Sequence, residues 1–275
     1  MTQIAGYDSA SPPLTPFAWV AQLRANAGLI RLLVSKDLRI RYKRSLLGVW
    51  WSLLSPLMEM AVLAAVFSQV FRARTDDVPY VVYVLSGIVV AALMRNVILR
   101  TSASLSENAV TLSRMRVPAE LFSIAVALEV GVNFLVSLIP LLALTLLSGA
   151  SISWTAPLLL GPTVLTLLFG FGIGLALAPT VARFVDVLPL AGIVLGLVTY
   201  LAPVIYPFEI VPARYRFIVE LNPLFRFVDL FRETLYGAGF GSGIDWLVAL
   251  GYTLVALAVG GWLFARGRAV AIAVL

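Results

Sequence analysis

The sequence lacks two residue types on which much enzyme chemistry depends. Its 275 residues include no cysteine and no histidine, so the chain has no disulfides, no thiol chemistry and none of the commonest metal ligand. The phosphate-binding motif GxxxxGK(S/T) is also absent, and Lys36 and Lys43 are the only lysines that could serve in it. We therefore expect no catalytic residue, no metal and no cofactor on this chain.

Charged residues are also scarce. They make up 12% of the chain, whereas hydrophobic residues make up 61%, and the mean hydropathy of +0.98 lies outside the range of ordinary soluble domains. The net charge of +6 would suit a nucleic-acid partner, but no basic soluble domain remains to bind one. Membrane lipids with anionic headgroups are therefore the expected partners of the basic residues, and nucleic acid is not.

Apolar segments of about 20 residues, the length that crosses a bilayer as a helix, recur along the chain. They cover residues 50–71, 80–99, 119–147, 157–181, 187–206 and 244–265. The sequence therefore predicts an all-α, polytopic membrane protein with six transmembrane helices. Basic residues are concentrated before the first segment, in the second connection and in the tail, which predicts that both termini are cytoplasmic.

The remaining segments complete the expected organisation. Residues 1–45 are expected to form a cytoplasmic tail and an amphipathic helix that lies in the membrane interface, although packing of that helix on a soluble partner is an alternative. Residues 46–275 form the six-span domain. It includes a polar inner loop at 100–117 and an amphipathic outer connection at 207–243, in which prolines divide two short helices that would lie flat on the outer face.

Three motifs, in register over most of the chain, resemble one known family. They are a basic run containing RYK, LLG and WW ahead of the first span, APVIYP at 202–207, and NPL followed by FRETLYG at 222–237. Together they resemble the permease subunit of type-2 ABC exporters, in the polysaccharide branch that exports O-antigen and teichoic-acid precursors. This resemblance implies a transporter subunit in the bacterial plasma membrane rather than an enzyme.

The resemblance also implies partners and a substrate. Members of the family form homodimers of six-span permeases that pair with two separate ATPase subunits, which bind ATP and magnesium. The substrate would be a glycan carried on a polyprenyl diphosphate, such as an O-antigen, a teichoic acid or a galactan-like cell-wall polymer. The inner loop would then contact the ATPase through Glu107, Arg114 and Arg116. The outer helices would gate the exit, with candidate residues Arg214, Phe217, Phe225, Arg226 and Phe231.

Such an exporter needs sites for a diphosphate headgroup and for sugar rings. Charge-assisted donors at the cytoplasmic mouth would suit the headgroup, and the candidates are Arg39, Arg41, Tyr42 and Arg44, although insertion topology and lipid contact would also explain these residues. Aromatic faces and polar groups would suit the sugars. The candidate conduit residues are Trp50, Trp51, Glu59, Phe67, Tyr83, Tyr200 and Tyr206.

Each of these candidates has a plainer alternative. The aromatic residues could belong to the interfacial belt of the membrane, and Glu59 could lie at a dimer interface instead of in a conduit. For the intramembrane Glu129 and Asn133, structural hydrogen bonds between helices are favoured over a role in transport.

Two other functions remain open at this point. The same kind of machinery could export a drug or a simple lipid, for which sugar-stacking aromatics would not be needed. An ATP-independent lipid scramblase or secondary transporter is a further alternative. Secondary transporters usually carry inverted repeats, and the sequence shows no convincing internal repeat.

Overall fold

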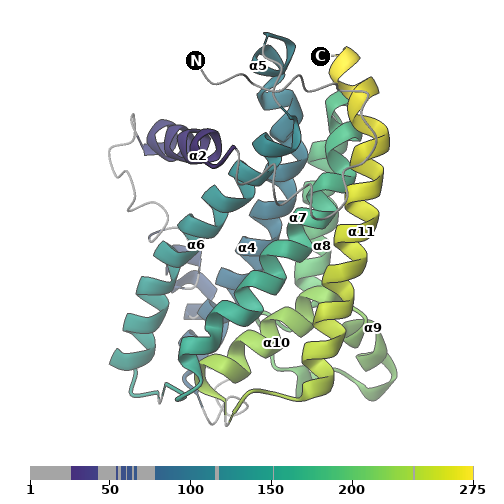
Figure 1. The fold of residues 1–275 in the computed structure, drawn as a ribbon. Helices are drawn as coiled ribbons and strands as arrows, with labels where there is room; N and C mark the ends of the chain where they lie inside the picture. The colour runs from purple at the N-terminus through teal and green to yellow at the C-terminus, as the bar shows by residue number, and fades with distance from the viewer. Residues whose placement is uncertain are drawn as a thin grey trace.

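The computed structural model describes residues 26–42, 54, 57–59, 61–63, 65–66, 78–114, 118–150, 152–237 and 239–274. These residues form helices and no strands, which confirms the predicted all-α class (Figure 1). The longer helices are α2 (Ala27–Tyr42), α4 (Tyr80–Glu107), α6 (Glu120–Leu147), α7 (Leu160–Arg183), α8 (Val187–Leu201), α10 (Pro223–Tyr236) and α11 (Gly243–Val274). Short helices are α5 (Ala109–Arg114), η2 (Ala156–Leu159), η3 (Phe208–Ile210), η4 (Ala213–Tyr215) and α9 (Arg216–Glu220).

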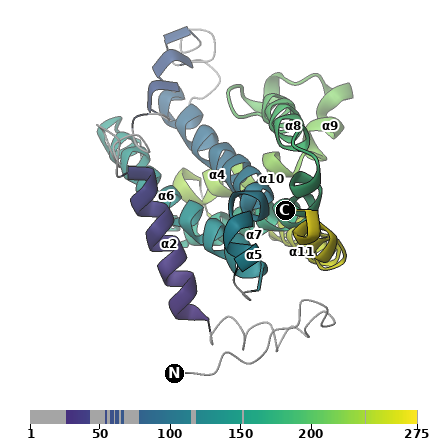
Figure 2. The same ribbon diagram turned by 90° about the horizontal axis from the view of Figure 1, so that it is seen from above.

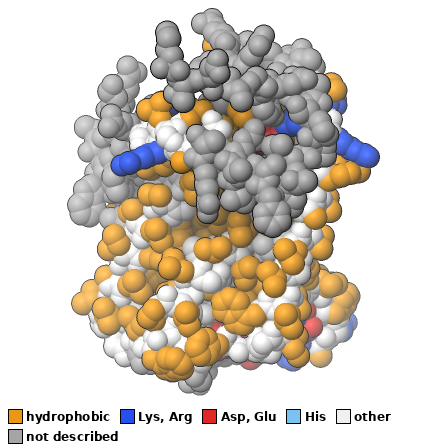
Figure 3. Space-filling model, in the orientation of Figure 1, with side chains coloured by type: hydrophobic (Ala, Val, Ile, Leu, Met, Phe, Trp, Pro, Cys, Tyr) orange, Lys and Arg blue, Asp and Glu red, His pale blue; other side chains and the backbone are white. Residues whose placement is uncertain are grey.

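Four helical segments are long and apolar enough to cross a membrane. They are Tyr80–Glu107, Glu120–Leu147, Ala156–Arg183 and Gly243–Arg268, and they correspond to the second, third, fourth and sixth predicted segments. Hydrophobic side chains cover most of the described surface between the two ends on the face seen in Figure 3, with charged groups near the ends. The protein is therefore a multi-pass membrane protein by the length and composition of these helices.

The first and fifth predicted segments differ from the other four. Most of the first segment lies outside the described residues, and the helical residues within it are 54, 57–59, 61–63 and 65–66. The fifth was predicted to extend to residue 206, but α8 ends at Leu201. Ala202 is extended, with ψ 146°, because it precedes Pro203, and a residue before proline is disfavoured in the helical conformation. The count of six spans stays a prediction.

The bundle has two distinct ends. Figure 1 shows α5 and the C-terminal end of α11 at one end, and α9 and α10 at the other. Helix α2 lies across the bundle axis at the α5 end, where it packs against α6 and buries Leu33 (Figures 1 and 2). The predicted inner loop is largely helical, because α4 continues to Glu107 and α5 follows it.

Glycine allows two of the long helices to approach closely. The α carbon of Gly172 on α7 faces the backbone of α11, where an added Cβ would lie 2.5 Å from the carbonyl carbon of Ala256. An added Cβ on Gly260 of α11 would overlap the carbonyl oxygen of Gly172. Close backbone contact of this kind replaces the hydrophobic driving force that helices lack inside a lipid environment.

Helix α10 lies across the end of the bundle opposite α5 rather than flat on its surface (Figure 1). It contacts α4, α7 and α11, and the side chains of Leu224, Phe227 and Phe231 on its apolar face are at most 1% exposed. Burial of each such side chain contributes about 1.5–3 kcal/mol relative to exposure. The amphipathic pattern was correctly recognised from the sequence, but it reflects a helix buried against protein.

The start of α10 is fixed by Asn222. Its side-chain oxygen accepts a hydrogen bond from the backbone N–H of Leu224 at 3.0 Å, and Pro223 occupies the first helical position, where a missing N–H costs nothing. The Asn222 amide also donates to the carbonyl oxygen of Val198 on α8, at 2.8 Å. One side chain therefore caps α10 and ties it to the last turn of α8.

Candidate functional site

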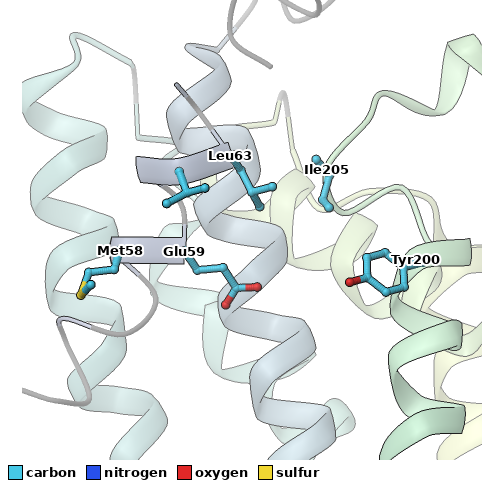
Figure 4. Close-up of a pocket in the computed structure, with 6 residues that line it drawn as sticks. Met58, Glu59, Leu63, Tyr200 and Ile205 are labelled. Carbon is cyan, nitrogen blue, oxygen red and sulfur yellow. The ribbon is translucent and has the colours of Figure 1, made fainter. Parts of the chain in front are cut away.

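Two predicted conduit residues that are distant in the sequence line one cavity. The cavity has a volume of about 370 Å³ and is lined by Met58, Glu59, Val62, Leu63, Tyr200 and Ile205. Figure 4 shows the Glu59 carboxylate and the Tyr200 hydroxyl pointing into it from opposite sides. Glu59 lies in the helical residues 57–59 and Tyr200 lies near the end of α8, with 71% of its surface exposed. The cavity thus combines an accessible aromatic ring, one carboxylate and apolar walls.

The backbone that follows α8 borders this cavity and is fixed by tyrosine hydroxyls. Tyr80 donates to the carbonyl oxygen of Ile205 at 2.8 Å. Tyr83 lies within hydrogen-bond distance of the carbonyl oxygens of Tyr206 (3.0 Å) and Pro203 (3.2 Å). The segment 202–206, which we call the α8 turn, is therefore tied to α4 through two side chains.

Two further predicted conduit residues have their hydroxyls occupied at this turn. The Tyr206 hydroxyl lies 3.2 Å from the carbonyl oxygen of Leu201 and 3.3 Å from that of Tyr200, and the Tyr83 hydroxyl is held by the contacts above. Both residues support the turn beside the cavity and are not among the residues that line it. The remaining predicted conduit residues, Trp50, Trp51 and Phe67, lie outside the described residues.

A buried arginine binds the α8 turn from the other side. Arg232 of α10 is only 7% exposed, and its guanidinium donates to the carbonyl oxygens of Pro203 (2.8 Å), Tyr83 (2.9 Å) and Val204 (3.0 Å). Its Nε also donates to the Ser86 hydroxyl at 3.3 Å, and the guanidinium lies 3.6 Å from the centre of the Tyr83 ring. Arg232 thus joins α10, α4 and the α8 turn.

Glycine makes room for this arginine. An added Cβ on Gly87 of α4 would lie 2.7 Å from Nη2 of Arg232 and 3.0 Å from the carbonyl oxygen of Val204. Arg232 is part of the FRETLYG motif, but sequence reasoning assigned it no role. Its position in the sequence could have indicated burial, because Arg232 lies next to the apolar stripe of α10, one helical turn after the buried Val228.

The predicted gate residues fall into two groups. Arg214 and Phe217 are exposed, and the Arg214 guanidinium lies over the ring of Tyr215. By contrast, Phe225 and Phe231 are buried, where Phe225 stacks on Phe208 with the ring centres 5.1 Å apart and Phe231 packs edge-on against Phe134. The buried pair belongs to the core at the α10 end of the bundle.

The fifth predicted gate residue, Arg226, forms an ion pair. Its Nη1 lies 2.7 Å from the Asp245 carboxylate, which joins α10 to the start of α11. On the same helix, burial and the nearby Glu233 raise the pKa of Asp229 to about 6, although Arg232 and Arg226 oppose the shift. Helix α10 therefore carries both positive and negative side chains (Arg226, Asp229 and Glu233) close in sequence to Arg232.

The other predicted site residues belong to the opposite end of the bundle. Residues 39, 41 and 42 lie in the last turns of α2, Glu107 is exposed at the end of α4, and residue 114 ends α5. Arg44 and Arg116 lie outside the described residues. The candidate headgroup and ATPase contacts that are described therefore lie at the same end as α5 (Figure 1).

The intramembrane carboxylate Glu129 is fully buried and paired. It forms an ion pair with Arg100 of α4 and accepts a hydrogen bond from Asn133, one turn further along α6. This pairing joins α4 to α6 and confirms the structural interpretation of Glu129. A further ion pair, between Arg268 and Glu120, joins α11 to the start of α6.

Comparison with known proteins gives a consistent picture. A model of the family described as "ABC-2 type transporter" matches residues 28–236. An O-antigen export system permease protein of Myxococcus xanthus is 25% identical over 79% of this chain and 84% of its own length. A Klebsiella pneumoniae protein of the same name is 22% identical over 74% of this chain and 79% of its own. A polysialic acid transport protein of Escherichia coli is 22% identical over 84% of this chain and 90% of its own.

Proposed function

We propose that this chain, which belongs to the ABC-2 type transporter family, is the transmembrane subunit of an exporter that moves a polysaccharide linked to a polyprenyl diphosphate across the plasma membrane. The observation that best supports this proposal is the cavity lined by Glu59 and Tyr200. The similar proteins are named for O-antigen export and for polysialic acid transport, so a glycan is the class of substrate to which the cavity should be compared.

The cavity has the chemistry that a passing glycan requires. A sugar ring presents an apolar face of C–H groups, which can stack on an aromatic ring, and a rim of hydroxyls, which needs hydrogen-bond partners. The exposed ring of Tyr200 supplies the first, while its hydroxyl and the Glu59 carboxylate supply the second. A drug or simple lipid would not need this combination.

The energy source and the assembly are part of the proposal. ATP hydrolysis would take place on separate ATPase subunits, because this sequence has no phosphate-binding loop, and two copies of the chain would form the pathway. The ATPase would contact the end that carries α2 and α5, which would be cytoplasmic, as would both termini. The exposed residues Arg214 and Phe217, at the outer end, would contribute to the exit gate.

The headgroup site is proposed on Arg39, Arg41, Tyr42 and Arg44. Replacement of Arg41 and Arg44 by glutamine should abolish export while membrane insertion and pairing with the ATPase continue. Export that continues at the level of the wild type would remove the headgroup role and leave lipid contact as the explanation for these residues.

Reconstitution tests the function directly. The chain and its ATPase partner would be purified together, placed in proteoliposomes and given either undecaprenyl diphosphate with a short glycan or the same carrier without one. We expect the glycan-bearing carrier to stimulate ATP hydrolysis and to cross the membrane. Tyr200→Ala should reduce this stimulation roughly tenfold through loss of stacking.

A matched control lies on the same helix. Leu190 of α8 is 60% exposed but does not line the cavity, so Leu190→Ala should leave the stimulation unchanged. Equal stimulation by the carrier without a glycan, or transport in the absence of the ATPase, would contradict the proposal. The first result would favour a lipid exporter and the second a scramblase or secondary transporter.

A further inference from the structure

The described residues bring charge of a single sign to the cavity beside the α8 turn. Among the lining residues that the structure describes there is one carboxylate, that of Glu59, and neither lysine nor arginine. The geometry points to Glu59 as a specificity-determining residue that favours glycans whose repeating units carry no carboxylate or phosphate group. This inference rests on the proposed function and narrows it, because it disfavours acidic polymers such as teichoic acid and polysialic acid.

The walls of the cavity strengthen any repulsion inside it. Met58, Val62, Leu63 and Ile205 are apolar, and although Met58 and Val62 are more than half exposed, a charged group packed against these side chains gives up part of its hydration. Repulsion between like charges at contact distance increases as the effective dielectric constant falls, and apolar walls focus the field of a fixed charge. An anionic sugar residue beside Glu59 would therefore be strongly disfavoured.

Arg232, which contacts the α8 turn, does not offset this charge, because protein groups already bind it. Its guanidinium donates to the carbonyl oxygens of Pro203, Tyr83 and Val204 and to the Ser86 hydroxyl. Among the described residues that line the cavity, none carries a guanidinium or an ammonium group that could pair with an anionic sugar.

A neutral glycan meets favourable groups at the same place. Its hydroxyls can donate hydrogen bonds to the Glu59 carboxylate, and a hydrogen bond to an ionised acceptor is stronger than one between neutral groups. Its ring can stack on Tyr200. The diphosphate of the carrier brings charge past Glu59 once per molecule, whereas an acidic glycan would bring it with every repeating unit.

A matched pair of substrates tests this inference. The proteoliposomes described above would receive undecaprenyl diphosphate with a short galactose oligomer, or with a galacturonic acid oligomer of the same length, which differs by one carboxylate per residue. Stimulation of ATP hydrolysis and arrival of glycan in the lumen would be measured for each. For the wild type we expect the ratio of galactose to galacturonate response to be roughly tenfold or more.

Variants of Glu59 should change this ratio rather than simply lower activity. Glu59→Gln should reduce the ratio to near one, Glu59→Asp should retain most of it, and Leu190→Ala, on α8 outside the cavity, should leave it unchanged. High salt should also reduce the ratio for the wild type, because ions screen a repulsion between charges. The measurement at high salt uses the wild type, so it still tests the role of the Glu59 charge if Glu59→Gln fails to assemble.

The outcomes separate this inference from the proposed function. If neither glycan stimulates the wild type, the proposed function is wrong and the inference fails with it. If both stimulate the wild type equally, or if the ratio is unaffected by both Glu59→Gln and salt, the function stands and the role of Glu59 is overturned.

Discussion

Two arginines of the bundle have different partners. At the α10 end, Arg232 binds neutral backbone carbonyls, whereas between α4 and α6 Arg100 is paired with the buried carboxylate of Glu129. The two arrangements do different things. The Arg232 contacts fix the shape of a turn beside the cavity, because one guanidinium holds three carbonyls in fixed positions. The Arg100 contact joins two helices and offsets the charge of a carboxylate that is 0% exposed.

The comparison predicts that the two arginines differ in their cost of removal. Arg232 is 7% exposed and donates to three backbone carbonyls, whereas the Arg100 side chain is 29% exposed and is paired with the Glu129 carboxylate. Removal of the Arg232 side chain should therefore lower the free energy of unfolding more than removal of the Glu129 carboxylate that pairs with Arg100.

The largest expected effect is that of Arg232→Met. This change keeps an unbranched side chain but removes the charged donor that the carbonyls of Pro203, Tyr83 and Val204 share, which should cost about 3–5 kcal/mol in the free energy of unfolding. The Tyr83 and Ser86 hydroxyls still reach the carbonyls of Pro203 and Tyr83, so the Val204 carbonyl should account for most of the loss. Thermal unfolding in detergent would measure it. The exposed Arg214 provides the matched control, since Arg214→Met should change stability by less than about 0.5 kcal/mol. Equal effects of the two changes would show that the Arg232 contacts do not hold the turn.

The Arg100–Glu129 pair should give a smaller loss and a partial recovery. Glu129→Leu leaves Arg100 without its partner and should cost about 2–4 kcal/mol, and adding Arg100→Met should recover part of the loss, because no unpaired charge then remains. A double-mutant cycle on the unfolding free energy would measure this coupling. Additive effects of the two substitutions would mean that the pair does not join α4 to α6.

The sequence predicted more of the helices than of the site. Long apolar segments identified the four spans because length and hydropathy are local properties of the chain. The end of α8 at Leu201 was missed, although Pro203 was a usable signal. The meeting of Glu59 and Tyr200 depends on packing between distant segments, and no local pattern encodes it. Arg232 was missed because its main acceptors are backbone carbonyls, which every residue has.

Tyr83→Phe should have a moderate effect on the α8 turn. The phenylalanine ring keeps its packing under Arg232 but loses the hydroxyl near the carbonyl oxygens of Tyr206 and Pro203, which should lower the unfolding free energy by about 1 kcal/mol. Because the turn borders the cavity, the glycan-stimulated ATPase rate should fall as well. Normal stability together with a normal rate would show that the Tyr83 hydroxyl does not hold the turn.

Asp229 should give the smallest effect, and its dependence on pH is the test. Burial and Glu233 raise the pKa of its carboxyl from 3.8 to about 6, so the folded protein binds this proton more tightly than the unfolded chain does. The contribution of Asp229 to stability should therefore be fully present below pH 4 and decline as pH rises to about 6, with little change above that.

The change in unfolding free energy with pH should be small, and variants of Asp229 and Arg226 test its origin. Asp229 is partly exposed, so solvent screens its interactions and we expect a change of only about 1 kcal/mol between pH 4 and pH 7. Asp229→Asn should remove this slope from a series of thermal unfolding measurements, whereas Arg226→Met should increase it. A slope that survives in Asp229→Asn would show that the raised pKa of Asp229 does not produce it.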